Sequence, residues 1–191
     1  LNTDCDLSNK AIENDLQDDQ DASVPKVCFS VDGGVERCFY LMVPDCARDN
    51  PSAVSLIVDF HDRGSCPLIQ SQTSGWREFA LSDCFVVAWP LGTTDSSIAD
   101  EPCFTVPGGI STVNSFGMSL GSPPDCCCTK GGKLIPYTAT NDLAFIKTLI
   151  SKAMDEAKDR NVAINSTSVH LTGYGNGATA ALGYAALYSS E

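Results

Sequence analysis

The chain has 191 residues with 24 acidic and 12 basic side chains, which gives a formal net charge of -12 and a pI near 4.4. A chain of this length forms one domain and can bury a core of its own without relying on disulfides. Its negative field repels phosphate backbones and anionic headgroups, and no apolar run approaches the roughly 18 residues that span a bilayer, so nucleic acid and membrane binding are poor candidates.

The first segment of the chain is strongly acidic. Between residues 1 and 25 the acidic side chains greatly outnumber the single Lys10, and apolar periodicity is weak. We predict a solvated arm over residues 1–25, rather than a cation or partner site, followed by one domain over residues 26–191. Because the chain opens at Leu1 without the regions of a signal peptide, we expect a soluble chain that has already been processed.

Two segments with period-2 alternation, Val27–Val31 and Val35–Val43, flank the tripeptide Asp32-Gly33-Gly34. Alternating runs around such a turn predict a β-hairpin. This hairpin would bring Cys28 near Cys38, although the sequence does not settle their pairing.

The middle of the chain carries two mostly apolar runs, Val54–Phe60 and Phe85–Trp89, with a short predicted helix at Gly75–Ser82 between them. Strands that are apolar on both faces predict a parallel sheet covered by helices. Residues 90–137 are rich in Gly, Pro, Ser and Thr and lack sustained periodicity. We expect a long loop region that shapes a site or is held by disulfides.

The clearest helix is predicted over Asn141–Arg160, with Asn141 in the capping position. Its apolar stripe consists of Leu143, Ile146, Ile150, Ala153 and Ala157. A buried strand is predicted at Ser168–Thr172, followed by a glycine-dense turn and an alanine-rich helix from Ala178 to about Tyr188. We expect the histidine within that strand, His170, to be a core residue.

Cysteine usage is heavy, without any CxxC pair and with only 2 histidines as possible co-ligands. We therefore predict a disulfide framework and no metal site, in an extracellular or lumenal compartment. The candidate disulfide residues are Cys5, Cys28, Cys38, Cys46, Cys66, Cys84, Cys103, Cys126, Cys127 and Cys128. The tripeptide Asn165-Ser166-Thr167 is an N-glycosylation acceptor at Asn165, which fits this compartment.

The segment Gly173-Tyr174-Gly175-Asn176-Gly177 lies between a predicted strand and a small-residue helix. This is the context of a nucleophile elbow, G-x-S-x-G, in which a strained turn exposes a catalytic serine. Here Gly175 stands where the serine is required. Without a hydroxyl or thiol, this position has no atom that attacks a carbonyl.

The order of motifs along the chain resembles the secreted polyhydroxybutyrate depolymerase and feruloyl esterase group of the α/β-hydrolase superfamily. The stretches that carry the resemblance are Arg37–Pro44, Val54–Gly64, Ser74–Gly92, Cys126–Cys128, Asn141–Ile146 and His170–Ala178. The resemblance implies an α/β-hydrolase-like, mostly parallel sheet flanked by helices, with an N-terminal hairpin. The C-terminal part of that fold would be missing from this chain.

Carried over residue by residue, the resemblance argues against activity. The family serine falls at Gly175, and the His-Gly loop that helps to form the oxyanion hole falls at His61, where Asp62 replaces the glycine. An acidic side chain there opposes a developing oxyanion. The acid and histidine of the triad follow the serine in chain order, and no histidine follows Gly175 here. We expect His61 to hold its loop by hydrogen bonding.

These observations lead to a non-catalytic, disulfide-stabilised protein with a structural or binding role. The alternative is an altered or truncated form of a serine esterase. A remote alternative reads Gly173-Tyr174-Gly175-Asn176-Gly177-Ala178 as the dinucleotide fingerprint G-x-G-x-x-A. Against that alternative, the motif follows most of the chain, and the acidic residue expected about 20 positions later has no room before Glu191. We expect no cofactor.

The strand Ser168–Thr172 also leads to a prediction about partners. In an α/β-hydrolase frame further strands pair with the strand that feeds the elbow, and soluble proteins avoid leaving such an apolar edge unpaired. We therefore expect a second polypeptide on this edge, either the C-terminal half of the same precursor or a partner subunit.

Overall fold

A computed structural model describes residues 22–31, 34–93, 99, 101–105, 129–131, 133–134 and 140–188. The acidic arm up to residue 21, most of the predicted loop region and the cysteines Cys5, Cys126, Cys127 and Cys128 lie outside these residues.

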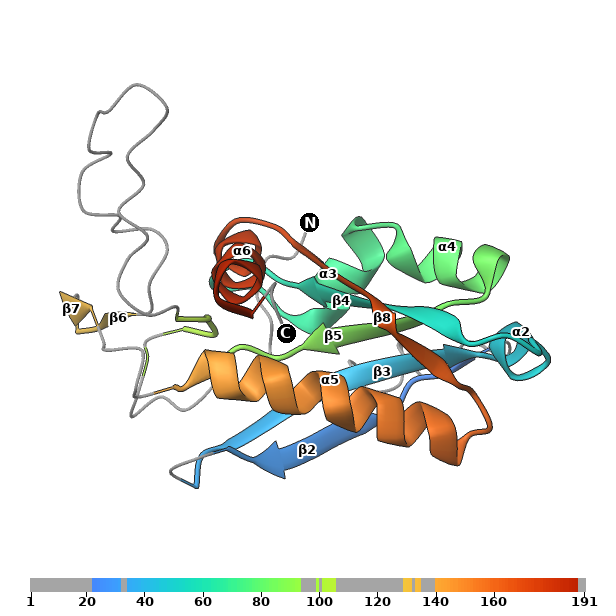
Figure 1. The fold of residues 1–191 in the computed structure, drawn as a ribbon. Helices are drawn as coiled ribbons and strands as arrows, with labels where there is room; N and C mark the ends of the chain where they lie inside the picture. The colour runs from blue at the N-terminus through green and yellow to red at the C-terminus, as the bar shows by residue number, and fades with distance from the viewer. Residues whose placement is uncertain are drawn as a thin grey trace.

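The described core is a mixed α/β fold built on one sheet with the order β1-β3-β5-β4-β8, and β2 pairs with β3 (Figure 1). The strands β5, β4 and β8 run parallel, whereas β3 pairs antiparallel with β1, β2 and β5. The bounds are β1 Ala22–Ser23, β2 Lys26–Ser30, β3 Glu36–Pro44, β4 Val54–Phe60, β5 Val86–Pro90 and β8 Ile164–Gly173. A separate pair is formed by β6 Thr129–Lys130 and β7 Lys133–Leu134.

The predicted hairpin is confirmed by β2 and β3, which place Cys28 directly opposite Cys38. The two cysteines form a disulfide, and a second disulfide joins Cys46 to Cys84. Cys66 and Cys103 are disulfide-bonded as well. Every cysteine in the described residues is therefore oxidised.

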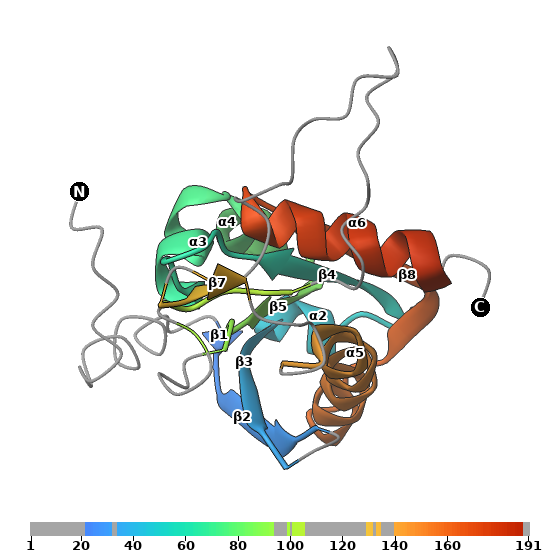
Figure 2. The ribbon, with the colours of Figure 1, turned by 90° about the vertical axis from the view of Figure 1, so that its left-hand side faces the viewer.

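Helices cover both faces of the sheet. Figures 1 and 2 show α3 and α4 on one side of the strands and α5 on the other. The bounds are α2 Asp45–Arg48, α3 Pro67–Thr73, α4 Trp76–Asp83, α5 Asp142–Asp159 and α6 Asn176–Tyr188. None of the described helices is both long and apolar enough to cross a bilayer.

The two faces of the sheet enclose separate hydrophobic clusters. Phe39, Leu56 and Phe60 belong to the larger cluster, which is closed by side chains of α5 and α6. Met42, Ile57 and Trp89 point to the opposite face, where α3 and α4 pack. The odd and even positions of β3 and β4 thus serve different helices, as expected for strands that are buried on both faces.

The helix α5 agrees with its prediction, and four residues of the apolar stripe are buried: Leu143, Ile146, Ala153 and Ala157. Asn141 is the N-cap residue, as predicted, but the expected side-chain cap is not formed. Asn141 precedes the helix in a left-handed conformation, with a φ of 46°, and its side chain makes no capping hydrogen bond. Its carbonyl oxygen accepts the first helical bond from the N–H of Phe145.

The strand β8 differs from the expected short buried strand, because it runs from Ile164 to Gly173 and much of it is exposed. It is the last strand on its side of the described sheet. Val169 and Leu171 pack against the larger cluster, but alternation turns His170 to the other face. His170 is exposed, so the expectation of a core histidine is wrong.

Candidate functional site

The turn between β8 and α6 lies against the end of β4. A Cβ atom on Gly173 would lie 2.8 Å from the carbonyl oxygen of Phe60, and one on Gly177 would lie 2.5 Å from that of His61. The N–H of Tyr174 donates to the Phe60 carbonyl at 3.1 Å. Only glycine permits this close approach of the turn to β4.

Gly175 occupies the tip of the turn with a φ of 52°, in the left-handed region that favours glycine. The carboxylate of Asp62 lies directly beside it. A Cβ atom on Gly175 would overlap with the Asp62 carboxylate carbon and Oδ1. The structure therefore brings together two positions singled out in the sequence, and it leaves no room between them for a side chain on residue 175.

The Asp62 carboxylate binds two backbone N–H groups with a single oxygen. Oδ1 accepts the N–H of Arg63 at 2.7 Å and the N–H of Asn176, the first residue of α6, also at 2.7 Å. Two backbone donors aimed at one point are the arrangement that stabilises an oxyanion in acyl transfer. Here a side chain of the same chain fills that point.

His61 fixes the loop that carries Asp62. It is fully buried; its Nε2 accepts the N–H of Gly92 at 3.0 Å, and its Nδ1 lies 2.6 Å from the carbonyl oxygen of Asp62. Because Nε2 is an acceptor, the proton is on Nδ1 and is donated to that carbonyl. Burial lowers the pKa of His61 from 6.5 to about 4, although the neighbouring Asp62 opposes the shift. This agrees with the loop-holding role expected for His61.

Contacts that the sequence did not indicate hold the same region. The buried Asn176 side chain accepts the N–H of Phe104 at 2.7 Å and donates to its carbonyl at 2.9 Å. Arg63 pairs with Glu101 at 2.8 Å. These partners come from the predicted loop region, which carried no periodic signal that could have placed them.

A cavity of about 680 Å³ opens beside the turn. Its lining includes the acids Asp59 and Asp62 together with Ile69, Trp76 and Tyr174. Burial raises the pKa of Asp59, against the opposing effect of hydrogen bonds from Ser74, Gln70 and Trp89. Neither histidine of the chain lines this cavity, so none of its hydroxyl groups has an imidazole base beside it.

A serine and a histidine do meet elsewhere, on β8. Ser168 Oγ lies 3.2 Å from His170 Nε2 and 2.7 Å from Ser55 Oγ. A working triad also needs a group that orients the other imidazole nitrogen. Among the described residues no carboxylate contacts His170, and its pair with Ser168 lies on the exposed face of β8.

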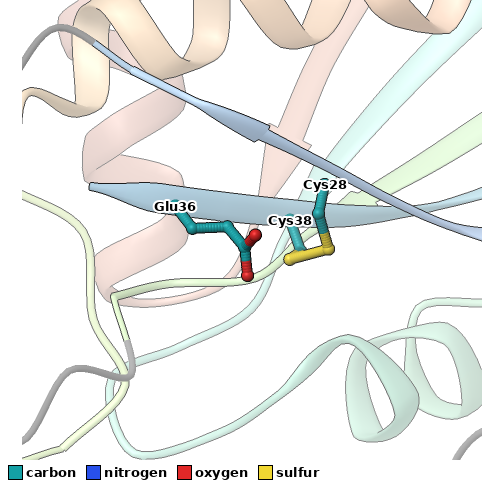
Figure 3. Close-up of side chains that lie close together, drawn as sticks. All are labelled: Cys28, Glu36 and Cys38. Atoms are coloured by element: carbon teal, nitrogen blue, oxygen red, sulfur yellow. A yellow bond between two sulfur atoms is a disulfide. The ribbon is translucent and has the colours of Figure 1, made fainter. Parts of the chain in front are cut away.

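Three potential metal ligands gather on the hairpin, where Cys28, Glu36 and Cys38 have ligand atoms within 4.8 Å of one another (Figure 3). The two sulfur atoms are joined in a disulfide and are not thiolates. Since the thiolate is the metal-binding form of cysteine, this cluster offers a metal only the carboxylate of Glu36.

No family model matches the sequence, and no curated protein sequence is detectably similar to it. Solved structures do match. A ferulic acid esterase is 10% identical, with a TM-score of 0.51, covering 88% of this chain and 56% of its own. A mutant of the esterase Est22 is 13% identical, with a TM-score of 0.50, covering 95% and 42%. An S-formylglutathione hydrolase from Agrobacterium tumefaciens is 14% identical, with a TM-score of 0.49, covering 88% and 54%.

These similarities establish the fold class. The chain has an α/β-hydrolase-like fold, with central parallel strands flanked by helices, and the first two of these structural neighbours are esterases. The chain spans about half the length of the ferulic acid esterase and Est22 structures. At such low identity the match carries over the fold and not the activity.

Proposed function

We propose that this chain is a non-catalytic protein of the hydrolase fold with a structural or binding role. The observation that carries the proposal is the Asp62 carboxylate, whose Oδ1 accepts the N–H groups of Arg63 and Asn176 beside Gly175. An ester substrate would have to place its carbonyl oxygen at a point that is already occupied by a negatively charged carboxylate. It would also find no nucleophile on residue 175.

The proposal is tested by incubating the purified chain with short-chain nitrophenyl esters and with a fluorophosphonate probe. We expect neither turnover nor labelling above a heat-denatured control. The variant Gly175→Ser and the double variant Asp62→Ala/Gly175→Ser should be equally inactive, because neither histidine of the chain is placed to deprotonate the new serine: both ring nitrogens of His61 are engaged with backbone groups, and His170 is exposed on β8. Turnover or labelling of the unmodified chain would overturn the proposal.

A second candidate is an altered or truncated form of a secreted serine esterase of the polyhydroxybutyrate depolymerase or feruloyl esterase type. It is compatible with one observation: the chain spans about half the length of the esterase structures that share its fold. Sequencing the genomic locus, both at codon 175 and past the codon for Glu191, separates the two candidates. A serine codon at 175, with an Asp and a His encoded downstream, would support the esterase.

The dinucleotide-binding alternative is weakened by the same carboxylate. A dinucleotide pyrophosphate binds at the N-terminus of the helix that follows the glycine turn. In this chain the N–H of Asn176 at that N-terminus already donates to Asp62. An anionic pyrophosphate would be repelled by that charge.

The binding role that we propose involves another polypeptide on the edge of Ser168–Thr172, either the C-terminal half of the precursor or a partner subunit. A groove of about 700 Å³ between β8 and α6 supports it. Val169, Leu171 and Tyr184 line this groove together with Leu182, which is 66% exposed. The sequence from Ile164 to Tyr188 contains no Asp, Glu, Lys or Arg, although the whole chain carries a net charge of -12.

We also propose an extracellular or lumenal location. Its support is the oxidised state of all six described cysteines, since disulfides persist in oxidising compartments. Free-thiol titration of the denatured, non-reduced protein tests the location. Finding more than two free thiols among the ten cysteines would contradict it.

A further inference from the structure

The ladder between β4 and β8 is interrupted near the start of β8. Val54 pairs with Ile164 and Leu56 pairs with Val169, so a step of two residues on β4 faces a step of five on β8. The extra residues of β8 leave the regular ladder as a bulge. The tripeptide Asn165-Ser166-Thr167 lies within this bulge.

All three residues of the tripeptide are exposed. Oδ1 of Asn165 accepts the N–H of Thr167 at 3.0 Å and the hydroxyl of Thr167 at 2.8 Å. Both bonds fix the orientation of the amide through its oxygen. Among the described residues, no group accepts a hydrogen bond from Asn165 Nδ2, so this nitrogen is left to solvent.

We propose that Asn165 is an N-glycosylation site, a modification that rests on the proposed extracellular or lumenal location. A transferase would join Nδ2 of Asn165 to the anomeric carbon of an oligosaccharide carried on a lipid pyrophosphate. The carbon–oxygen bond to the pyrophosphate breaks, the lipid pyrophosphate leaves, and a base of the transferase takes one Nδ2 proton. The bulge accommodates the product because Asn165 contributes neither to the core nor to the β4 ladder.

A glycan at this position also restricts how the open edge of β8 is used. Soluble proteins protect exposed strand edges with bulges and with groups that block edge-to-edge pairing. The glycan would be attached near the start of β8, in the bulge that precedes the regular pairing from Val169 onward. A partner strand is then confined to the edge at Ser168–Thr172, next to the groove between β8 and α6.

In the test, the full chain is expressed in eukaryotic cells with a cleavable secretion signal at its N-terminus. The whole lumenal and secreted fraction is then analysed. We expect one N-glycan, seen as a mobility shift that peptide-N-glycosidase removes, with conversion of Asn165 to aspartate detected by mass spectrometry. On the gel, the variant Thr167→Ala should have the same mobility as the enzymatically deglycosylated protein. The variant Ser166→Ala, which is equally exposed and keeps the acceptor pattern, should retain the shift.

An Asn165 that stays unmodified in the disulfide-bonded lumenal protein would overturn the glycosylation site while leaving the proposed location intact. Free thiols in protein from its natural source would contradict the location instead. A glycan that persists in Thr167→Ala would place the modification on another residue and would equally overturn the proposal.

Discussion

Gly175 and Asp62 are coupled at the level of single atoms. The carboxylate lies where the Cβ atom of any other residue at 175 would be, and it is held there by two N–H groups. Glycine at 175 and aspartate at 62 therefore depend on each other. Either substitution alone changes the surroundings of the other residue, and their effects on stability should not be additive.

We predict that Gly175→Ser lowers the free energy of unfolding by about 2–4 kcal/mol, through the overlap with Asp62 and the left-handed backbone. In the double variant with Asp62→Ala, the overlap is relieved. The measured coupling energy in a urea-denaturation cycle should then be at least about 1 kcal/mol.

The variant Gly34→Ser is the control for backbone strain. Gly34 also has a left-handed φ, of 80°, but a Cβ atom there would contact nothing within 4 Å. Gly34→Ser should lower the free energy of unfolding by only about 1–2 kcal/mol, and adding Asp62→Ala should not change this loss. Additive effects at residues 62 and 175 would show that the carboxylate does not occupy the space beside Gly175.

The buried His61 makes stability depend on pH. Its pKa is about 4 in the folded chain, against an ordinary value of 6.5, so the unfolded chain binds the proton more readily. Stability is therefore lost as the pH falls from about 6.5 toward 4. Between pH 7.5 and pH 5 this residue alone should remove about 2 kcal/mol from the free energy of unfolding.

The variant His61→Gln isolates this contribution. It should be less stable than the unmodified chain at pH 7.5, but its free energy of unfolding should fall less on acidification. The comparison is necessary because Asp59 acts in the opposite direction. Burial raises the pKa of Asp59, so its protonation on acidification favours the folded state. Equal pH dependence of the two proteins, measured by urea denaturation, would rule out a neutral, buried His61.

At the scale of elements, one buried ion pair joins β3 to α5. Arg37 and Asp142 are 2.5 Å apart and almost fully buried. Asp142 Oδ2 also accepts the N–H of Thr105 at 2.6 Å and the hydroxyl of Thr140 at 2.7 Å. The guanidinium of Arg37 further lies 4.1 Å from the ring centroid of Phe145. The first turn of α5 is thus anchored by its acidic residue rather than by a cap from Asn141.

We predict that Asp142→Asn costs about 3–5 kcal/mol of stability, because it leaves the Arg37 charge buried without its partner. The matched control is Asp45→Asn, which breaks an exposed pair with Arg48 at the same separation of 2.5 Å. That variant should cost well under 1 kcal/mol. Similar unfolding free energies for the two variants would show that the Arg37–Asp142 pair is not desolvated.

Local patterns predicted the elements whose burial they encode directly. The hairpin, β4, β5 and α5 follow from periodicity, and the glycines around residue 175 follow from the close contact that the elbow requires. The helix α3 was not predicted, because its seven residues carry no amphipathic stripe. The exposure of β8 was mispredicted because its burial depends on which elements cover it, and a strand's own composition does not contain that information.

The site was predictable only in part for the same reason. Asp62 and Gly175 could be singled out as departures from a motif. The hydrogen bonds of His61 with Gly92 and of Asn176 with Phe104 join segments that are far apart in sequence. Nothing local in either segment specifies those pairings.

At the scale of the whole molecule, charge and apolar surface are separated. The chain carries a net charge of -12, yet β8 and α6 have no charged side chain. On α6, Leu182 is 66% exposed and Leu187 57%, and α6 packs beside β8, the last strand on its side of the described sheet. Self-repulsion of the acidic chain is weakest at this surface, so contacts between chains should form here first.

We predict that unglycosylated residues 1–191, produced alone, oligomerise or aggregate through β8 and α6. Light scattering at micromolar concentration measures the association. The variant Leu187→Lys should shift the population toward monomer, because it adds a charge to the apolar face of α6. Phe79→Lys on α4 should not, although Phe79 is also 57% exposed, because α4 packs against the other face of the sheet from α6. A monodisperse monomer of the unmodified chain, with slow amide exchange across Ser168–Thr172, would mean that the chain covers its own sheet edge and needs no partner there.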